Sequence, residues 1–403
     1  MRAAAPARLL DLTRLLSRLG QGPLTGVDRV EAAWLDHLLD APQPCFGLLR
    51  TRLGFLLLDR KGMQALRDRL EGLPLGPADL AGRLFRRSQP WRAKAEADMR
   101  RLACDRCLAP LLSPLLRRHL PAGSCYLNLG HANLSEFALR RIRAAGLRVV
   151  VLVHDVIPLE HPEFTRPGIP AVFRRKMAAV SAGADLVIHS TEDARRRTEA
   201  QLARLGRTPP GITAPLGVPM PRPDPATPLP ALRYFVAVGT IEPRKNHALL
   251  LDVWDRLEES LPAGEVPQLL LLGRRGWNND EVFQRLDARA RSGSAVREHP
   301  DLPDGAVAAL LAGAEALLFP SFAEGYGLPP LEAMALGVPV LCSNLPVFAE
   351  TLGDYPVYLD PNDRYLWIRV IAGRSPAGGR PPARGLPDWA SHFRAVTAAC
   401  DAL

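Results

Sequence analysis

Two carboxylates and two adjacent cations are the side chains of this sequence best suited to an anionic ligand that also carries hydroxyl groups. Glu324 and Glu332 flank a loop, and Arg244 and Lys245 follow a strand-like run that ends in a glycine. Neighbouring cations can neutralise a diphosphate, and arginine can do so with two parallel hydrogen bonds. Carboxylates accept hydrogen bonds from hydroxyls. A nucleotide sugar carries both kinds of group and would satisfy all four side chains.

The loop between the two glutamates is rich in glycine and proline. Gly325 and Gly327 allow backbone conformations that a side chain would forbid and let the main chain approach a ligand. Pro329 and Pro330 suit the start of a short helix, whose free amides and partial positive charge suit a phosphate. Glu332 would lie in the first turn of that helix. The helix dipole alone stabilises an acid there by roughly 0.3–1 kcal/mol, so Glu332 also has an explanation without a ligand.

The residues around these glutamates resemble the Glu-x7-Glu signature of the retaining family 4 glycosyltransferases of GT-B fold. The signal is specific because glycines, prolines and both acids match together, although the family usually has Phe where Tyr326 stands. The resemblance implies a catalytic role for Glu324. It implies donor-binding roles for Gly325, Tyr326, Gly327, Leu328 and Glu332. The matching residues are Glu324, Gly325, Tyr326, Gly327, Leu328, Pro329, Glu332, Ala333, Gly337, Val338, Pro339 and Val340.

Two glycine-bearing segments upstream of the signature resemble the family's other donor-binding loops. GTIEPRKN follows a strand-like run and resembles the phosphate-binding segment, which implies that Gly239, Arg244 and Lys245 contact the diphosphate. GRRGW follows the next strand-like run and resembles a loop near the nucleotide base, which implies roles for Gly273 and Arg274. A solvated basic surface is the alternative explanation of these cations.

The resemblance implies an α/β fold of the GT-B type. Two Rossmann-like domains with doubly wound parallel sheets would face each other, and a C-terminal helix would cross back. From residue 125 onward, strand-like and helical runs alternate, which favours the same class. A linker at 215–233 contains seven prolines. We therefore expect an acceptor-side domain at 1–220, a nucleotide-sugar-binding domain at 221–385, and a helix at 386–403 that packs on the first domain.

In the first domain, several polar residues lie at or just past the ends of expected strands, where doubly wound sheets bind ligands. HDVIPLEHPEF resembles the family's His-Asp segment, which implies that His154 contacts the hexose and that Asp155 orients it or meets the acceptor. His131 and Asn128 follow another strand. Gly26, in TGVDRV, resembles a glycine loop beneath the sugar phosphate. A polar strand end and an ordinary turn with a helix cap are the alternatives.

The N-terminal part of the chain is less informative. Residues 1–20 have apolar side chains at helical spacing, and we interpret them as part of the fold. Within 45–120, two short apolar runs could be strands and the stretch from residue 76 is helical and basic. We assign no functional residue there. Ser190 is expected to cap a helix.

Composition restricts the function classes. The formal net charge is +9, which suits anionic partners, but aromatic residues make up only 6% of the chain and no basic stripe is interleaved with them, so we expect no nucleic-acid binding. No apolar run is long enough to span a membrane, and the six cysteines are scattered, which suits a reducing cytoplasm. The absence of GxGxxG argues against a dehydrogenase. Without an Asp-x-Asp motif, we expect neither a metal nor a cofactor beyond the donor.

Taken together, the resemblance implies a retaining hexosyltransferase that works without a metal. The first expectation for the donor is GDP-mannose, and the second is a UDP-hexose. The acceptor would be a hydroxyl of a glycan or lipid-linked glycan in bacterial surface polysaccharide synthesis. The enzyme would be cytoplasmic, with peripheral attachment to the inner, anionic face of the cytoplasmic membrane as a further expectation. The alternatives are a catalytically silent nucleotide-sugar-binding subunit and a GT-B sugar-nucleotide epimerase or phosphorylase.

Overall fold

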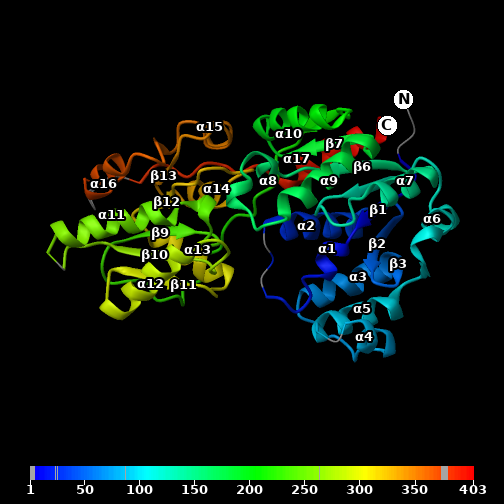
Figure 1. Cartoon of the computed structure of the whole chain (residues 1–403), viewed down its shortest axis with the longest axis horizontal. Coiled ribbons are helices and arrows are strands. Elements are labelled where there is room, and N and C mark those ends of the chain that lie inside the picture. The colour runs from blue at the N-terminus through cyan, green and yellow to red at the C-terminus, as the bar shows by residue number, and fades with distance from the viewer. Residues whose placement is uncertain (1–4, 23, 25, 87, 263, 374–379) are drawn as a thin grey trace. The chain divides into compact units, whose positions relative to one another are not determined.

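The chain forms two compact units, each built around its own sheet (Figure 1). The computed structural model describes residues 5–22, 24, 26–86, 88–262, 264–373 and 380–403. The first unit comprises Met1–His154, Ala171–Leu216 and Trp389–Leu403. The second unit comprises Asp155–Pro170 and Gly217–Asp388. The expected boundaries placed all of 1–220 in one domain, whereas residues 155–170 group with the second unit.

The first unit has a mixed sheet of eight strands in the order β4-β3-β2-β1-β5-β6-β7-β8. β1 pairs in parallel with β2 and β5, while β3 is antiparallel to both its neighbours. The sheet therefore differs from the expected parallel arrangement at one edge. The close approach of β3 to β4 requires a glycine at Gly54, because a Cβ there would lie 2.1 Å from the Cys107 carbonyl oxygen. The strands are β1 (Arg8–Asp11), β2 (Cys45–Thr51), β3 (Gly54–Leu58), β4 (Asp105–Cys107), β5 (Cys125–Asn128), β6 (Arg148–Leu152), β7 (Leu186–His189) and β8 (Gly211–Thr213).

The helical expectation for residues 1–20 is wrong over Arg8–Asp11, which form a central strand. Every residue of β1 is buried, but its two ends are the charged Arg8 and Asp11, so no continuous apolar run of the kind typical of a buried strand marks it in the sequence. The expected cap at Ser190 is also wrong, because Thr191 Oγ1 accepts the Ala194 amide at 3.0 Å. The helices are α1 (Thr13–Leu16), α2 (Gly26–Asp40), α3 (Arg60–Leu70), α4 (Leu80–Phe85), α5 (Pro90–Leu102), η1 (Ala109–Leu111), α6 (Leu112–His119), α7 (Glu136–Ala144), α9 (Ile169–Gly183), α10 (Glu192–Leu205) and α17 (Trp389–Asp401).

The C-terminal helix α17 belongs to the first unit. Trp34 Nε1 of α2 donates to His392 Nε2 at 3.1 Å, and the rings of His37 and Phe393 stack with centroids 4.0 Å apart. Both contacts join α2 to α17, so aromatic packing holds the end of the chain on this unit.

The second unit has a wholly parallel sheet of six strands in the order β11-β10-β9-β12-β13-β14. This is the 3-2-1-4-5-6 order of a doubly wound fold. α11 packs beside α16 (Figure 1), and its Trp254 is buried in the core with Phe235 and Trp367. The strands are β9 (Tyr234–Val238), β10 (Gln268–Leu272), β11 (Val296–His299), β12 (Leu317–Phe319), β13 (Val340–Ser343) and β14 (Val357–Leu359). The helices are α8 (Ile157–Glu160), η2 (Pro162–Phe164), η3 (Pro243–Lys245), α11 (His247–Ser260), α12 (Asp280–Ser292), α13 (Asp304–Gly313), α14 (Leu328–Ala335), α15 (Pro346–Leu352) and α16 (Arg364–Ala372).

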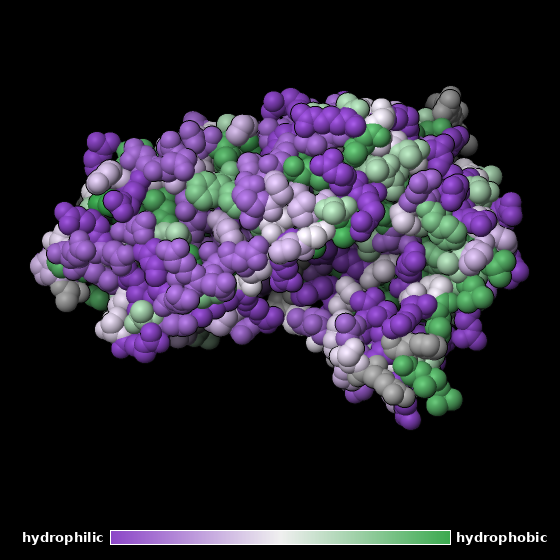
Figure 2. All heavy atoms as spheres, in the orientation of Figure 1, coloured by the Kyte–Doolittle hydropathy of each residue, from purple (hydrophilic) through white to green (hydrophobic). Residues whose placement is uncertain are grey.

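The face of the second unit that Figure 2 shows is mostly hydrophilic. Across the described ranges, no helix is both long and apolar enough to span a membrane.

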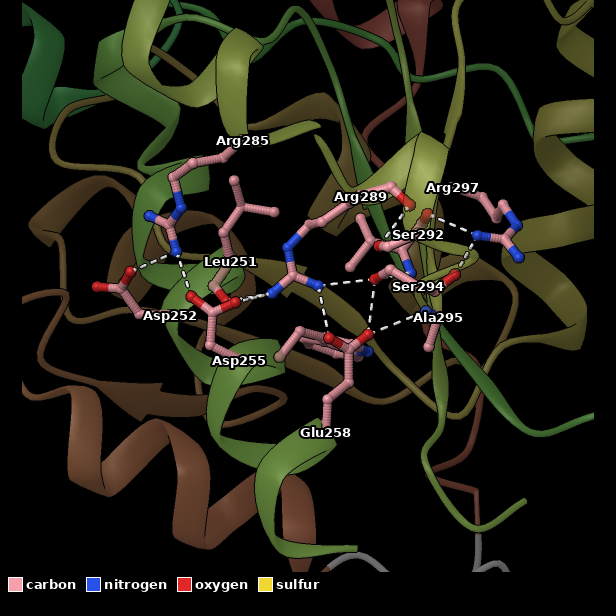
Figure 3. Close-up of polar contacts among 12 residues, drawn as sticks. Leu251, Asp252, Asp255, Glu258, Arg285, Arg289, Ser292, Ser294, Ala295 and Arg297 are labelled. Carbon is pink, nitrogen blue, oxygen red and sulfur yellow. Dashed lines mark hydrogen bonds and ion pairs between the residues drawn. The ribbon is translucent and has the colours of Figure 1, made fainter. Parts of the chain in front are cut away.

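A buried arginine ties α11, α12 and the start of β11 together (Figure 3). Arg289 donates to Glu258 Oε2 at 3.0 Å, to Ser294 Oγ at 2.7 Å and to the Leu251 carbonyl at 3.2 Å, and it also pairs with Asp255. Its side chain is only 8% exposed. The network therefore replaces the hydration that this guanidinium loses on folding.

We expect Arg289→Met to lower the free energy of unfolding of the second unit by about 2–3 kcal/mol, since it leaves acceptors of this network without their donor. Arg285→Met is the matched control on the same helix. Its guanidinium is more exposed and pairs with Asp252 and Asp255 at 2.7 Å, so the loss should stay below about 1 kcal/mol. Urea unfolding followed by circular dichroism measures both, and equal losses would contradict the expectation.

Candidate active site

The candidate site of the second unit lies where its strand order reverses, between β9 and β12. Ligands bind at such a switch point, beyond the carboxyl ends of the strands. Arg244 and Lys245 follow β9, and Glu324 follows β12. The topology thus brings these three residues together, as the sequence predicted for the basic pair and the first glutamate.

The loops after β9 and β10 approach each other without room for side chains. A Cβ on Gly273 would lie 2.1 Å from the Gly239 carbonyl oxygen, and one on Gly276 would lie 2.7 Å from Thr240 Cγ2. The Ile241 amide donates to the Arg274 carbonyl at 2.9 Å, so backbone hydrogen bonds continue past the strands. Gly273 and Gly276 therefore have a steric role that holds with or without a ligand.

Glu324 is the centre of a buried ion-pair cluster. Lys245 Nζ lies 2.6 Å from Glu324 Oε1, and Arg244 Nη1 lies 2.7 Å from Glu324 Oε2. Arg244 Nη2 also contacts Glu242 Oε1 at 2.6 Å. Lys245 Nζ lies over the Phe319 ring, 4.1 Å from its centroid. Two cations and two carboxylates thus balance, so an anionic ligand would have to draw the cations away from Glu324.

The cluster fixes the charge of its members. Burial opposes ionisation of Glu324, but Arg244 and Lys245 outweigh it and lower the pKa of Glu324 to about 2. Burial also opposes the charge on Arg244, yet Glu324 and Glu242 raise the Arg244 pKa above its ordinary value. For Lys245, burial prevails over Glu324 and lowers its pKa. Lys245 is therefore the cation whose charge depends most on a nearby anion.

The helix after the signature loop begins one residue earlier than expected. α14 starts at Leu328, after Gly327 in the left-handed region at φ 87°, and a Cβ on Gly327 would lie 2.7 Å from Phe348 Cε1. Glu332 lies beyond the first turn and is half-buried. The first-turn position expected for Glu332 is therefore wrong, and with it the explanation from the helix dipole. Tyr326 is buried in the same loop.

The His-Asp segment is divided between the units. Asp155 belongs to the second unit and adds to the charges that raise the pKa of Arg244. His154 belongs to the first unit, where its Nε2 lies 2.7 Å from the Leu129 carbonyl and its ring lies 5.3 Å from that of His131. Arg274 lies apart from the cluster, since it is exposed and pairs with Asp301 at 2.6 Å.

A second polar group lies at the switch point of the first sheet, between β1 and β5. The hydroxyl of Tyr126 donates to Asp11 Oδ2 at 2.8 Å and accepts from Asn128 Nδ2 at 2.8 Å. The Asn128 Oδ1 and both carboxylate oxygens of Glu31 are buried without a hydrogen-bond partner. Burial raises the pKa of Glu31 well above its ordinary value, with Asp11 adding to the effect.

Sequence reasoning missed Asp11 and Glu31. Asp11 was hidden in a stretch expected to be helical, and Glu31 lies within α2, whose first residue is Gly26. Nothing in the sequence marked Glu31, because its burial beside Asp28, which pairs with Arg14 and Arg18, is seen only in the fold. In the parts of the chain that the structure describes, no three His, Cys, Asp or Glu side chains are gathered as a metal-binding group.

Buried neutral histidines predict how stability depends on pH. Burial lowers the pKa of His154 and His392 to about 4 and that of His247 to about 3. Between these values and the ordinary 6.5, the unfolded chain binds more protons than the folded chain. Stability should therefore fall as the pH falls from 6.5 to 4, by about 1.4 kcal/mol per pH unit for each such histidine.

Urea unfolding at pH 7.5, 6 and 5 measures this slope. His392→Gln should reduce it, because His392 Nε2 accepts from Trp34 and protonation would break that bond. A wild-type stability that is flat over this range would contradict the expectation.

Comparison with known proteins relates the second unit to a known family. Residues 229–368 match the family model of the group 1 glycosyl transferases. The O-antigen chain mannosyltransferase B of Escherichia coli is 34% identical over 229 residues, covering 54% of this chain and 58% of the relative. The serotype-specific mannosyltransferase WbdA of Escherichia coli is 28% identical over 265 residues, covering 62% of this chain and 30% of the relative. The chain thus spans about half or less of the length of these relatives. The chain is thus similar to the group 1 glycosyl transferases over part of its length.

Solved structures show the GT-B fold along nearly the whole chain. The Anabaena protein HepE, solved in complex with UDP-glucose, matches with a TM-score of 0.59 at 14% identity, over 98% of this chain and 94% of that one. Sucrose-phosphate synthase of Thermosynechococcus elongatus matches with a TM-score of 0.55 at 15% identity, again over 98% and 94%. The fold expected from the sequence is confirmed.

Proposed function

We propose that this chain is a retaining hexosyltransferase that moves mannose from GDP-mannose to a hydroxyl of a growing surface glycan or lipid-linked glycan. The observation that carries the proposal is the Arg244, Lys245 and Glu324 cluster, which lies at the switch point inside the segment that matches the family. The relatives named as O-antigen mannosyltransferases support mannose as the sugar. HepE, solved with UDP-glucose, keeps a UDP-hexose as the second candidate donor.

The chemistry follows from the charges of the cluster. The bond between the anomeric carbon and the β-phosphate oxygen breaks, the acceptor oxygen bonds to that carbon on the same face, and the acceptor proton passes to the departing phosphate. Negative charge develops on the phosphate, and Arg244 and Lys245 are placed to stabilise it together with the amides of residues 325–327. Glu324, released by its cations, would accept hydrogen bonds from the hexose hydroxyls. These residues supply the needed charge without a metal.

The first unit would bind the acceptor. Its switch point carries the carboxyl groups of Asp11 and Glu31 and the amide of Asn128, all of which can bond to sugar hydroxyls.

On α4, Leu80 and Leu84 are 77% and 59% exposed beside the exposed Arg83, which supports a peripheral contact with an anionic membrane on the cytoplasmic side. Sedimentation with phosphatidylglycerol vesicles, compared for wild type and Leu80→Ser/Leu84→Ser, tests that contact.

The first experiment on function is a calorimetric panel of GDP, UDP, ADP and their hexose conjugates against wild type and Glu332→Ala. Selective binding of GDP and GDP-mannose, weakened by the substitution, is expected. If no nucleotide binds, the proposal fails. Binding without transfer to any glycan acceptor would instead favour a silent nucleotide-sugar-binding subunit.

Two further measurements test the finer parts of the proposal. The anomeric configuration of the product, read by NMR, should equal that of the donor, and inversion would contradict the retaining mechanism. Transfer should also continue in the presence of a chelator. A complete loss that Mn²⁺ or Mg²⁺ restores would overturn metal independence.

A further inference from the structure

The segment of residues 155–170, here called the strap, is inserted in the sequence between β6 and α9, which are elements of the first unit. In space it packs as part of the second unit. It contains α8 and η2, and its contacts are with two loops that follow strands of the second sheet. These are the loop after β10, at residues 273–278, and the loop after β12, at residues 320–327.

An aromatic stack joins the strap to the loop after β12. The rings of Phe164 and Phe322 are stacked with centroids 5.6 Å apart and planes 10° apart. His161 continues the stack, with its centroid 5.5 Å from that of Phe164. Such pairs stabilise a defined ring geometry beyond the burial of their area. Phe164 therefore restrains the position of Phe322.

Polar contacts fix the strap on the loop after β10. Trp277 Nε1 donates to the Phe164 carbonyl at 3.0 Å, and Asn278 Nδ2 donates to the Thr165 carbonyl at 3.0 Å. The Arg166 guanidinium lies over the Trp277 ring, 4.9 Å from its centroid. The backbone at the C-terminal end of η2 is thus held, and the Phe164 ring has a fixed base from which to contact Phe322.

Phe322 leads directly to the ion-pair cluster. Its amide donates to the Arg244 carbonyl at 2.9 Å, and Arg244 Nη1 donates to the Ala323 carbonyl at 2.7 Å. The next residue is Glu324, whose carboxylate pairs with Arg244 and Lys245. A continuous path of contacts therefore runs from Phe164 through Phe322 to Glu324.

We propose that Phe164 is a positioning residue for the donor site, and that the strap holds the Glu324 loop in the geometry that pairs with Arg244 and Lys245. The expected effect on nucleotide affinity rests on the proposed function. The restraint of the loop by Phe164 does not depend on the proposed function. The strap continues through the peptide bond between Asp155 and His154, where the chain passes from the first unit into the second.

Hydrogen exchange of the ligand-free protein tests the restraint. In Phe164→Ala the amides of residues 321–327 should exchange about three- to tenfold faster than in wild type, which corresponds to the loss of one aromatic pair. Phe164→Tyr keeps the ring and should restore protection. Tyr365→Ala removes an exposed aromatic of the same unit, 74% exposed, and should change nothing in this loop. Equal exchange in Phe164→Ala and wild type would overturn the proposal.

Calorimetry with GDP and UDP tests the consequence. For the nucleotide that wild type binds, the Kd should rise about three- to tenfold in Phe164→Ala and return in Phe164→Tyr, while the thermal unfolding midpoint stays close to that of Tyr365→Ala. Faster exchange with an unchanged Kd would overturn the positioning role. If wild type binds neither nucleotide, the proposed function fails, and the exchange experiment still decides whether Phe164 restrains the loop.

Discussion

Lys245→Met should lower the rate of the proposed hexose transfer by about 10²- to 10³-fold, because it removes one of the two cations that would stabilise the departing phosphate. Methionine has a similar length, so the packing against Phe319 is kept while the charge is lost. Glu324 retains Arg244 as a partner, so most of the fold's stability should remain. Single-turnover kinetics with labelled donor, at saturating acceptor, measure the loss.

Charge balance provides the control for this prediction. Lys245→Met leaves the buried Glu324 with one cation fewer, whereas Lys245→Met/Glu324→Gln removes both charges together. The double variant should recover the unfolding midpoint of wild type but should not recover transfer. A single variant that turns over within tenfold of wild type would show that Lys245 does not bear the phosphate. A double variant that regains activity would show that its role is only to neutralise Glu324.

Gly273→Ala should disrupt the second unit, at a cost of more than about 4 kcal/mol, which is exceptional for one methyl group. Its Cβ would lie 2.1 Å from a backbone oxygen and 2.6 Å from the carbonyl carbon of Gly239, and backbone atoms cannot move aside as a flexible side chain can. Relief would require the loops after β9 and β10 to separate. Thermal unfolding by calorimetry should show the transition of the second unit lowered or lost.

Gly385→Ala is the matched control, because no atom lies within 4 Å of the added Cβ. Gly385→Ala should leave the calorimetric unfolding transitions of both units in place. The result that would contradict the expectation is a Gly273→Ala protein whose calorimetric trace matches that of Gly385→Ala. Such a result would mean that the two loops can separate at little cost.

Most of the second sheet could be predicted from the sequence because its inner strands are short, largely apolar runs, whereas the edge strand β11 carries three polar residues and was not expected. Tyr234–Val238 and Gln268–Leu272 form strands at the expected positions. The first sheet was harder. β1 is central and buried on both faces, but its apolar residues merge with those of α1 into a spacing that also suits a helix. The antiparallel edge of β3 and β4 depends on pairing between distant residues, which no local pattern encodes.

For the candidate site, the residues themselves could be predicted from the sequence, but the residues with which they pair could not. The sequence indicated Arg244, Lys245 and Glu324, and topology explains why they meet at one switch point. It assigned the cations to a diphosphate, whereas in the folded chain they already pair with Glu324 and Glu242. It gave His154 and Asp155 neighbouring roles at the sugar, although the two belong to different units. Such assignments depend on long-range packing rather than on spacing.

The chain passes between the two units four times, at residues 154/155, 170/171, 216/217 and 388/389. Neither unit is therefore a single continuous stretch of the chain. A fragment cut at the proline-rich linker would lose the strap and uncover Phe322 and Trp277, and exposed aromatic surface of this kind promotes aggregation. A chimera that exchanges donor domains between relatives should carry residues 155–170 with the donor domain. The residues that build the candidate site and the strap therefore belong together, although they are not continuous in the sequence.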